Sequence, residues 1–181
     1  MKTLKPQTAA TAPEGSKENL RAIEERFGFV PNLLATFANS PAMLNGYLAL
    51  DTAWEKSSFS AREREMILLT ASVANRCRYC VAVHATALKA MHLEAAVIDA
   101  IRNRSPLADP KQDALVTVTR QLASERGYVS EAAKKAFFDA GYDVVALMEI
   151  LAGVALKTMS NYLDHLNPIS IDPAFEAQTQ Q

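Results

Sequence analysis

The sequence predicts an all-α fold of about eight helices, and three observations support this class. Apolar residues recur at steps of three and four residues through most of the 181-residue chain, as in Leu20, Ile23 and Phe27. Residues that favour helix ends flank these segments, with Ser or Asp before them and Gly or Pro after them. No run of alternating β-branched residues bounded by turns occurs in the sequence.

The expected helices are placed by these signals. They cover residues 16–26, 33–39, 41–54, 60–74, 78–91, 93–103, 110–125, 130–140 and 143–166. Ser16 is the expected N-cap of the first helix, and Ser60 with Glu63 forms a capping box. The aromatic residues Tyr47 and Trp54 are interpreted as core. The last helix is more apolar than one side of a monomer needs, so we expect it to reach a subunit interface.

The composition is that of one folded domain. Apolar residues make up 49% of the chain and charged residues 22%, with 6 Gly and 8 Pro, a balance that excludes extensive disorder. We expect residues 1–15, rich in Thr, Ala, Pro and Gly, to form a flexible N-terminal arm and residues 16–168 to form a single helical domain. Residues 169–181 are expected to form a polar, extended C-terminal tail.

Charge and hydropathy limit the partners and the compartment. The net charge of −1 argues against nucleic acid, and no signal peptide or run of about 20 apolar residues indicates a membrane. We therefore expect a cytoplasmic protein. One cluster of arginines is interpreted as a solvated helix face that pairs with Glu63 and Glu65. Its members are Arg62, Arg64, Arg76 and Arg78.

The stretch from Asn75 to His84 holds both cysteines and one of three histidines. Cys77 and Cys80 are three residues apart and can close a disulfide, while His84 follows one helical turn later. On one helix the three side chains fall within an arc of about 60°. The pair lies at the expected helix N-terminus, where the macrodipole lowers a thiol pKa. In a reducing compartment, such a pair is a cycling redox pair or a metal half-site.

Two effects favour different cysteines as the attacking thiol. The helix dipole favours Cys77, whereas His84 favours Cys80 because it can act as a general base one turn away. If Glu65 of the preceding helix reaches His84, it would orient the ring, although Glu65 alone could be a surface carboxylate near a helix N-terminus. We choose Cys80 as the attacking thiol and Cys77 as the resolving thiol.

Two other readings of the cysteines fit less well. Zinc would take Cys77, Cys80 and His84 as three ligands, but consecutive turns of one helix do not easily surround a tetrahedral ion. A thioredoxin fold is disfavoured because its motif belongs to a βαβ unit. His92 and His165 are interpreted as structural or surface residues.

The motif resembles that of a known family. Glu65, Cys77, Cys80 and His84 reproduce the pattern E-x11-C-x2-C-x3-H of the AhpD-like alkyl hydroperoxidases in the carboxymuconolactone decarboxylase superfamily. Residues 28–32 and 161–165 also look like the peroxidase-related branch, so the resemblance covers roughly residues 20–167. One position departs from the best-studied branch, which has a histidine where this chain has Tyr79.

The resemblance implies an AhpD-like helical fold, no metal or flavin cofactor, and a homotrimer or homohexamer. In the family the glutamate and histidine relay protons to the second cysteine, which assigns these roles to Glu65, His84 and Cys80, with Cys77 as the partner thiol. Tyr79 is an accessory position at which the relay, the substrate or the reductant can differ. The decarboxylases of the superfamily lack the cysteine pair, so lactone decarboxylation is a poor fit.

The resemblance also implies a function. The expected enzyme is a thiol-dependent peroxidase that reduces organic hydroperoxides or hydrogen peroxide through a Cys77 to Cys80 disulfide. An external dithiol, of dihydrolipoyl or thioredoxin-like type, would restore the thiols. The alternative is a redox sensor or a disulfide-exchange protein that uses the same pair without peroxide turnover.

Overall fold

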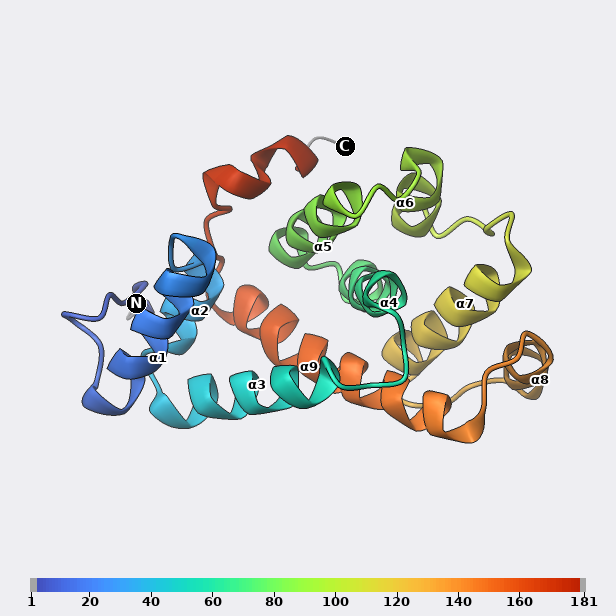
Figure 1. Ribbon diagram of the computed structural model, residues 1–181, viewed down its shortest axis with the longest axis horizontal. Helices are drawn as coiled ribbons and strands as arrows, with labels where there is room; N and C mark the ends of the chain where they lie inside the picture. The colour runs from blue at the N-terminus through green and yellow to red at the C-terminus, as the bar shows by residue number, and fades with distance from the viewer. Residues whose placement is uncertain (1–2, 180–181) are drawn as a thin grey trace.

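Nine α-helices and one 3₁₀ helix make up the part of the chain that the computed structural model describes, residues 3–179 (Figure 1). No β-strand occurs in this range, so the predicted all-α class is confirmed. The helices are α1 (Glu14–Phe27), α2 (Asn32–Phe37), α3 (Pro41–Trp54), α4 (Ala61–Ala74), α5 (Arg78–Ala90), α6 (Ala95–Arg102), α7 (Pro110–Ser124), α8 (Glu131–Asp139), α9 (Val144–Leu166) and the 3₁₀ helix η1 (Pro173–Gln178).

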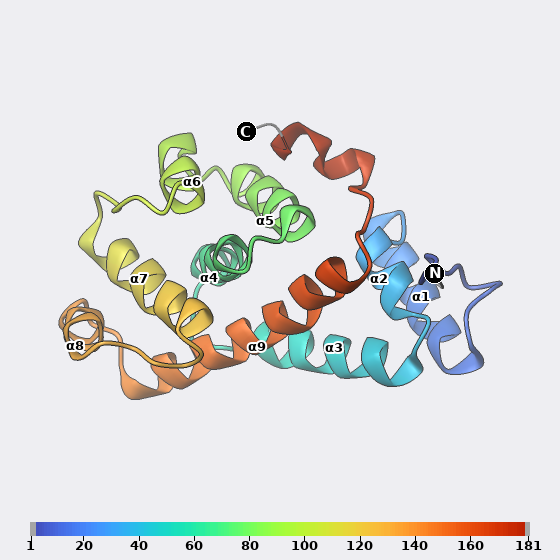
Figure 2. The same cartoon turned by 180° about the vertical axis from the view of Figure 1, so that it is seen from behind.

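Helix α4 is the central element of the fold. It packs against α5, α6, α7 and α9. The long helix α9 also contacts α3, α5 and α7 and extends along one side of the molecule (Figure 1). Seen from behind, α1 and α2 lie near one end of α9 and α8 lies near the other (Figure 2). Helices α4, α5 and α9 therefore meet in the middle of the molecule.

Local signals account for most helix ends. Ser60 and Glu63 form the predicted capping box on α4. The side chains of Asp109, Ser130 and Asp143 accept hydrogen bonds from first-turn amides of α7, α8 and α9. Because each of these signals acts within a few residues, the sequence is sufficient to place these four helix starts.

The start of α1 differs from the prediction. The helix begins at Glu14 after Pro13, and the expected N-cap Ser16 is buried inside it. Pro13 restricts φ just before the first turn, and the negative charge of Glu14 is stabilised by the positive end of the helix dipole. The helix therefore begins at Glu14 and not at Ser16. Phe27, expected on the buried stripe with Leu20 and Ile23, is 50% exposed at the last residue of the helix.

The predicted extended C-terminal tail is wrong for its central part. Residues 173–178 form η1, which packs on α5. The Phe175 ring lies between Tyr79 and Phe29, with centroid distances of 6.3 and 6.1 Å. In the predicted N-terminal arm, the Gln7 N–H donates to the Ala35 carbonyl at 2.9 Å. The first two residues of that arm and the last two of the tail lie outside the described range.

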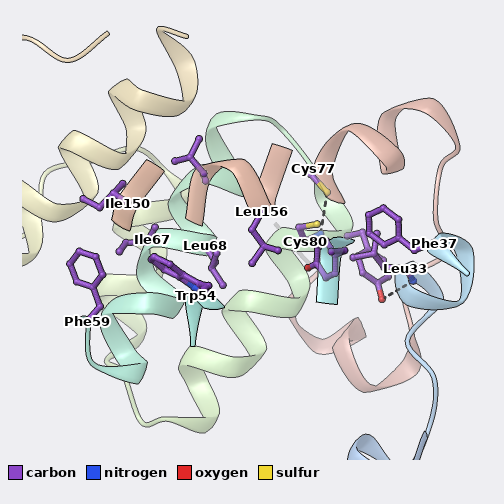
Figure 3. Packing of buried hydrophobic residues seen from close by; sticks show 14 of the residues in the cluster. Leu33, Phe37, Trp54, Phe59, Ile67, Leu68, Cys77, Cys80, Ile150 and Leu156 are labelled. Atoms are coloured by element: carbon purple, nitrogen blue, oxygen red, sulfur yellow. Dashed lines mark hydrogen bonds between the residues drawn. The ribbon is translucent and has the colours of Figure 1, made fainter. Parts of the chain in front are cut away.

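The larger of two hydrophobic clusters fills the space between α3, α4 and α9 and extends to the cysteines (Figure 3). Trp54, Ile67 and Leu156 belong to it, as do Cys77 and Cys80. Tyr47 is also buried, so the interpretation of the α3 aromatic residues as core is confirmed. A smaller cluster lies among α4, α5, α6 and α7. The cysteine pair is therefore part of the core and not of a surface loop.

Helix α9 is long and apolar enough to cross a membrane by length and composition alone. Its packing against α3, α4 and α7 shows that it serves here as a core helix.

Candidate active site

A tight turn between α4 and α5 positions both cysteines. Arg76 is left-handed, with a φ of 60°, and the Cys77 N–H donates to the Ser72 carbonyl at 3.0 Å, as in a Schellman turn. Cys77 is also the N-cap residue of α5, where its Sγ accepts a hydrogen bond from the Cys80 N–H at 3.3 Å. Both thiols are free and buried. The predicted position of the pair at the N-terminus of this helix is confirmed.

Glu65 and His84 meet between α4 and α5. His84 Nδ1 lies 2.8 Å from Glu65 Oε2, and because an ionised carboxylate only accepts, this contact assigns a proton to Nδ1. Burial acts to raise the pKa of Glu65, but the hydrogen bond from His84 and the positive charge of the His84–Lys157 pair outweigh it, and the pKa is lowered. The contact that the sequence left conditional is therefore present, and Glu65 is not simply a surface carboxylate.

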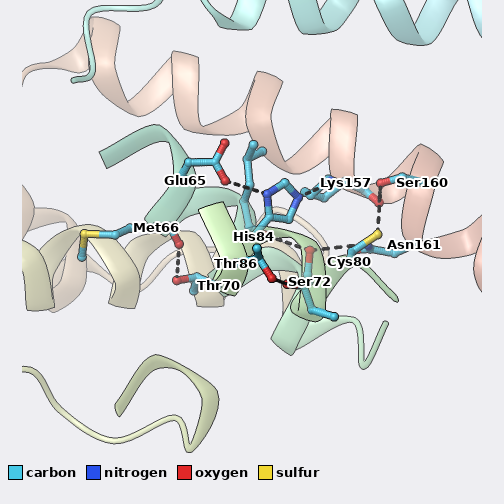
Figure 4. Close-up of polar contacts among 12 residues, drawn as sticks. Glu65, Met66, Thr70, Ser72, Cys80, His84, Thr86, Lys157, Ser160 and Asn161 are labelled. Atoms are coloured by element: carbon cyan, nitrogen blue, oxygen red, sulfur yellow. Dashed lines mark hydrogen bonds and ion pairs between the residues drawn. The ribbon is translucent and has the colours of Figure 1, made fainter. Parts of the chain in front are cut away.

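Two polar side chains reach the site from α9, and the sequence analysis predicted neither (Figure 4). Lys157 Nζ lies 2.7 Å from His84 Nε2, and Lys157 is only 2% exposed. Ser160 Oγ lies 3.8 Å from Cys80 Sγ. Both ring nitrogens of His84 are thus occupied, and the thiol of Cys80 contacts Ser160 in place of the expected imidazole.

One signal in the sequence could have indicated these residues. Lys157 is the only charged residue between Glu149 and Asp164, in a run that is otherwise mostly apolar. A lysine on a buried helix requires a polar or charged partner, so its position pointed to a buried site. Ser160 lies three residues later, on the same face of the helix.

The two thiols have opposite ionisation tendencies. The pKa of Cys80 is lowered, because the Cys77 thiol can donate a hydrogen bond to it and because the positive charge of the Lys157–His84 pair outweighs the effect of burial. The pKa of Cys77 is raised by the same interaction with Cys80 and by burial. Asp164 Oδ2, 3.4 Å from Cys77 Sγ, adds negative charge there. The favoured state is a Cys80 thiolate beside a Cys77 thiol.

Residues 41–121 match the sequence model of the carboxymuconolactone decarboxylase family. This segment begins with α3, ends within α7 and contains all four motif residues. Similar solved structures include an uncharacterized peroxidase-related protein from Ralstonia eutropha with an alkylhydroperoxidase AhpD core. That protein has 22% identity and a TM-score of 0.84, with 100% of this chain and 99% of that chain covered. The protein has the AhpD-like all-helical fold, and its central segment carries the sequence pattern of the carboxymuconolactone decarboxylase family.

Two further structures are similar to this AhpD-like protein. An uncharacterized peroxidase-related protein from Silicibacter sp. has 20% identity and a TM-score of 0.80, with 99% of each chain covered. The debrominase Bmp8 has 18% identity and a TM-score of 0.80, with 97% of this chain and 95% of that chain covered. No curated protein sequence matches the chain. At these identities the solved structures establish the fold.

Two cavities of this AhpD-like protein adjoin the N-terminal turn of α5, where the cysteine pair lies. One, of about 380 Å³, is lined by Cys77 and Val81, and the other, of about 630 Å³, by Tyr79 and Asp164. Both are also lined by Arg76, Arg78, Ile171 and Thr179. Cys80 is 1% exposed and lines neither cavity. The α5 turn and the C-terminal segment therefore form the accessible side of the site.

Tyr79 anchors the C-terminal segment and does not lie on the line from Glu65 to Cys80. Its hydroxyl donates to Asp172 Oδ2 at 2.7 Å and accepts from the Leu33 N–H at 3.4 Å. Burial and the hydrogen bond to Asp172 raise the pKa of Tyr79, which keeps the phenol neutral. Tyr79, the position at which the chain departs from the resemblance, therefore makes structural hydrogen bonds here.

The predicted pairing of the arginine cluster is wrong. Across residues 3–179, none of the four arginines forms an ion pair with Glu63 or Glu65. Glu65 is held by His84, while Glu63 bonds to Ser60 and Tyr142. Intrahelical spacing permits such pairs, but the tertiary partners of both carboxylates take precedence.

The remaining candidate residues have simple positions. His92 and His165 are exposed, in keeping with a surface role, and His165 stacks on Tyr162 with ring centroids 5.9 Å apart. Within residues 3–179, no group of three or more His, Cys, Asp or Glu side chains is arranged to hold a metal ion. His84, which the zinc interpretation required, has both ring nitrogens engaged.

Proposed function

We propose that this AhpD-like protein is a thiol-dependent peroxidase in which Cys80 attacks a hydroperoxide and Cys77 resolves the product. The observation that carries the proposal is the free cysteine pair at the start of α5, with a lowered pKa at Cys80 and a raised pKa at Cys77. A thiolate is the nucleophilic form of cysteine. The family and a structural neighbour are named for enzymatic activities, which supports an enzyme.

The proposed reaction has two steps. The Cys80 thiolate attacks the terminal oxygen of the hydroperoxide, so that an S–O bond forms as the O–O bond breaks and an alkoxide leaves. The alkoxide takes up a proton and departs as an alcohol, leaving Cys80 as a sulfenic acid. The Cys77 sulfur then attacks the Cys80 sulfur, and the Cys77 proton and the sulfenic hydroxyl leave as water. The two electrons come from the two sulfurs, which end as a disulfide.

An external dithiol regenerates the pair. Cys77 lines a cavity and Cys80 does not, so attack is expected on the Cys77 sulfur of the disulfide. The Cys80 thiolate is then the leaving group, and its lowered pKa makes it a good one. A dihydrolipoyl or thioredoxin-like protein could deliver such a dithiol, and a cytoplasmic location would supply the reductant.

Access to Cys80 requires a local opening. Its sulfur is buried, and Cys77 and Tyr79 are the neighbouring side chains that line the two cavities. A hydroperoxide therefore has to pass these side chains. Movement at the N-terminus of α5 or of the segment anchored by Tyr79 would provide the path.

The test is peroxide consumption by the reduced protein. Wild type should consume one equivalent of cumene hydroperoxide or hydrogen peroxide and form a Cys77 to Cys80 disulfide. Cys80→Ser should lose the reaction, while Cys77→Ser should consume one equivalent and stop at a sulfenic acid that dimedone traps. Equal, slow consumption by wild type and Cys80→Ser would overturn the proposal.

A sensor or disulfide-exchange protein would use the same residues. Addition of excess dihydrolipoamide separates it from a peroxidase, because an enzyme continues to consume peroxide over many turnovers. Arrest after one equivalent, despite the excess dithiol, would identify the sensor. Disulfide exchange without any reaction with peroxide would identify the exchange protein.

A second candidate is reductive debromination, favoured by the likeness to Bmp8. A variant of that debrominase has been solved in complex with 2,3,4-tribromopyrrole, at a TM-score of 0.81 and 17% identity to this chain. In this reaction two thiols would supply two electrons, a C–H bond would replace a C–Br bond, and bromide and a disulfide would form. Bromide release from tribromopyrrole, with no consumption of peroxide, would favour this function.

A further inference from the structure

The contact between Lys157 and His84 limits the charge that the site can hold. At 2.7 Å, Lys157 Nζ and His84 Nε2 share one hydrogen bond. Either an ammonium donates to a neutral imidazole, or an imidazolium donates to a neutral amine, because two protonated groups would place donor against donor. While this hydrogen bond persists, the two side chains together carry at most one positive charge.

That charge resides on the more basic group. The ordinary pKa values of lysine and histidine are about 10.4 and about 6.5, a difference that favours the ammonium by about four units. Burial acts to lower the pKa of Lys157, but the negative charge of its neighbours has the larger, opposite effect. The pKa of Lys157 is therefore raised. The neutral imidazole then accepts at Nε2 and donates from Nδ1 to Glu65, which agrees with the contact of 2.8 Å there.

The groups that face Lys157 and Cys80 come from every packed element. Helix α3 contributes Tyr47 and Asp51, α4 contributes Glu65, α5 contributes His84 and the Cys77 N-cap, and α9 contributes Ser160. One step farther out, Arg64 adds charge beside Glu65 and Asp164 adds charge beside Cys77. Tyr47 stays neutral below its raised pKa of about 12. Lys157 is the fully buried cation in this set.

We propose that Lys157, and not His84, carries the positive charge that holds Cys80 as a thiolate. Lys157 is thereby a positioning residue for the nucleophile, and His84 serves as a neutral bridge that fixes the ammonium against Glu65. This inference deepens the proposed peroxidase function, because it names the source of the thiolate. It also changes the expected Glu65 to His84 to Cys80 relay, since a lysine on α9 intervenes.

The test measures thiol ionisation without any peroxide, so its failure is separate from failure of the peroxidase proposal. In a Cys77→Ser background, Cys80 is the one remaining cysteine, and its thiolate is read by absorbance at 240 nm and by the pH dependence of alkylation with iodoacetamide. Lys157→Met is compared with His84→Gln. Lys89→Met, at an exposed lysine of α5, is the matched control.

Lys157→Met should raise the pKa of Cys80 by at least about one unit, a tenfold loss of thiolate below that pKa. His84→Gln should leave it within about half a unit, because the amide oxygen still accepts from the ammonium. Lys89→Met should leave the pKa of Cys80 equal to that of the Cys77→Ser protein. An unchanged pKa in Lys157→Met, or a larger rise in His84→Gln than in Lys157→Met, would overturn the proposal.

Folding of the variants is a separate control, by circular dichroism. Lys157→Met is expected to fold, because an unbranched apolar side chain replaces the lysine stem and His84 still donates to Glu65 through Nδ1. If it does not fold, His84→Gln decides alone. A low pKa of Cys80 in that variant supports the proposal, and a rise of more than about one unit contradicts it.

Discussion

At the scale of single residues, the site separates groups that ionise from groups that stay neutral. Cys80 and Glu65 have lowered pKa values, because each accepts a hydrogen bond, from Cys77 and His84 respectively, and lies near the positive charge of the Lys157–His84 pair. Cys77, Tyr47 and Tyr79 have raised pKa values, because each is buried with an anionic or anion-forming neighbour. One anionic sulfur therefore stands among neutral hydrogen-bonding groups, which is an arrangement suited to a nucleophile.

The neutral state of Tyr47 leads to a prediction about alkaline stability. Burial raises the pKa of Tyr47 to about 12, whereas the unfolded residue releases its proton near 10. The unfolded state therefore loses its proton first, and the contribution of Tyr47 to stability declines as the pH rises above 10. Between pH 10 and pH 11, the free energy of unfolding should fall in both proteins. The fall in Tyr47→Phe should be smaller than the fall in wild type by about 1 kcal/mol.

Urea unfolding of the reduced proteins at several pH values checks this prediction. Tyr128→Phe is the control, because Tyr128 is 81% exposed and its loss should not alter the slope. The decisive quantity is the slope of the free energy of unfolding against pH. If this slope is the same in Tyr47→Phe and Tyr128→Phe, Tyr47 ionises in the folded state as it does in the unfolded state.

The residues of the site divide by how far apart they lie in the sequence. Glu65, Cys77, Cys80 and His84 lie on two helices joined by a tight turn, so helical spacing and a known motif were sufficient to group them. Lys157 and Ser160 come more than 70 residues later, and only the packing of α9 on α5 brings them to His84 and Cys80. Local periodicity carries no information on that packing.

At the scale of elements, the crossing of α9 over α3 and α4 depends on Gly153. A Cβ at this position would lie 3.0 Å from Trp54 Cη2 and 3.2 Å from Ile67 Cγ2. Glycine normally destabilises a helix interior by about 1 kcal/mol relative to alanine, but overpacking costs about 1–3 kcal/mol. The cost of overpacking should exceed the gain in helix propensity, because Trp54 and Ile67 are both packed in the core and have no room to move.

Gly153→Ala should therefore lower the free energy of unfolding by about 1 kcal/mol. Gly46→Ala is the matched control on α3, since a Cβ there meets nothing within 4 Å. That variant should gain up to about 1 kcal/mol from helix propensity alone. Thermal unfolding of both variants checks the signs, and stabilisation by both would contradict the close approach of α9.

The C-terminal segment is a second element whose position has a specific anchor. Asp172 is buried and accepts from the Tyr79 hydroxyl at 2.7 Å and from the Asn32 N–H at 3.2 Å. Tyr79→Phe removes the first donor and leaves the carboxylate less satisfied, at a cost of about 1–3 kcal/mol. The segment that borders both cavities should then open more often.

Hydrogen exchange measures that opening. In Tyr79→Phe, amides of residues 169–178 should exchange faster, and iodoacetamide should alkylate the cysteines faster. Tyr162→Phe, at a half-exposed tyrosine of α9, should leave both rates unchanged. Equal rates in Tyr79→Phe and wild type would mean that Tyr79 does not anchor this segment.

This segment also shows where sequence patterns fail at the element scale. Helix ends such as Ser60 and Asp109 were predictable, because a cap acts within three residues. The position of η1 depends on Phe175 packing between Tyr79 and Phe29, and these contacts span about 100 residues or more of sequence. A six-residue 3₁₀ helix has too short a pattern to be recognised without those partners.

At the scale of the whole molecule, α9 has two apolar sides. Ile150, Val154 and Leu156 face the core. Five other large apolar side chains of the helix are 53–69% exposed, and Leu166 is 82% exposed. The exposed members are Val144, Val145, Met148, Leu151, Tyr162 and Leu166. An apolar surface along a core helix is typical of an interface between subunits.

We therefore expect the protein to assemble as a homotrimer or homohexamer through this side of α9. Met148→Glu combined with Leu151→Glu would place two charges in the interface, where their desolvation is unfavourable, and should shift the assembly toward monomer. Sedimentation velocity over a range of protein concentrations measures the shift. Arg21→Glu changes charge at an exposed site of α1, which packs on α3, and should leave the assembly intact. A wild-type monomer at high concentration, or an assembly that tolerates both glutamates, would assign the subunit contact to another surface.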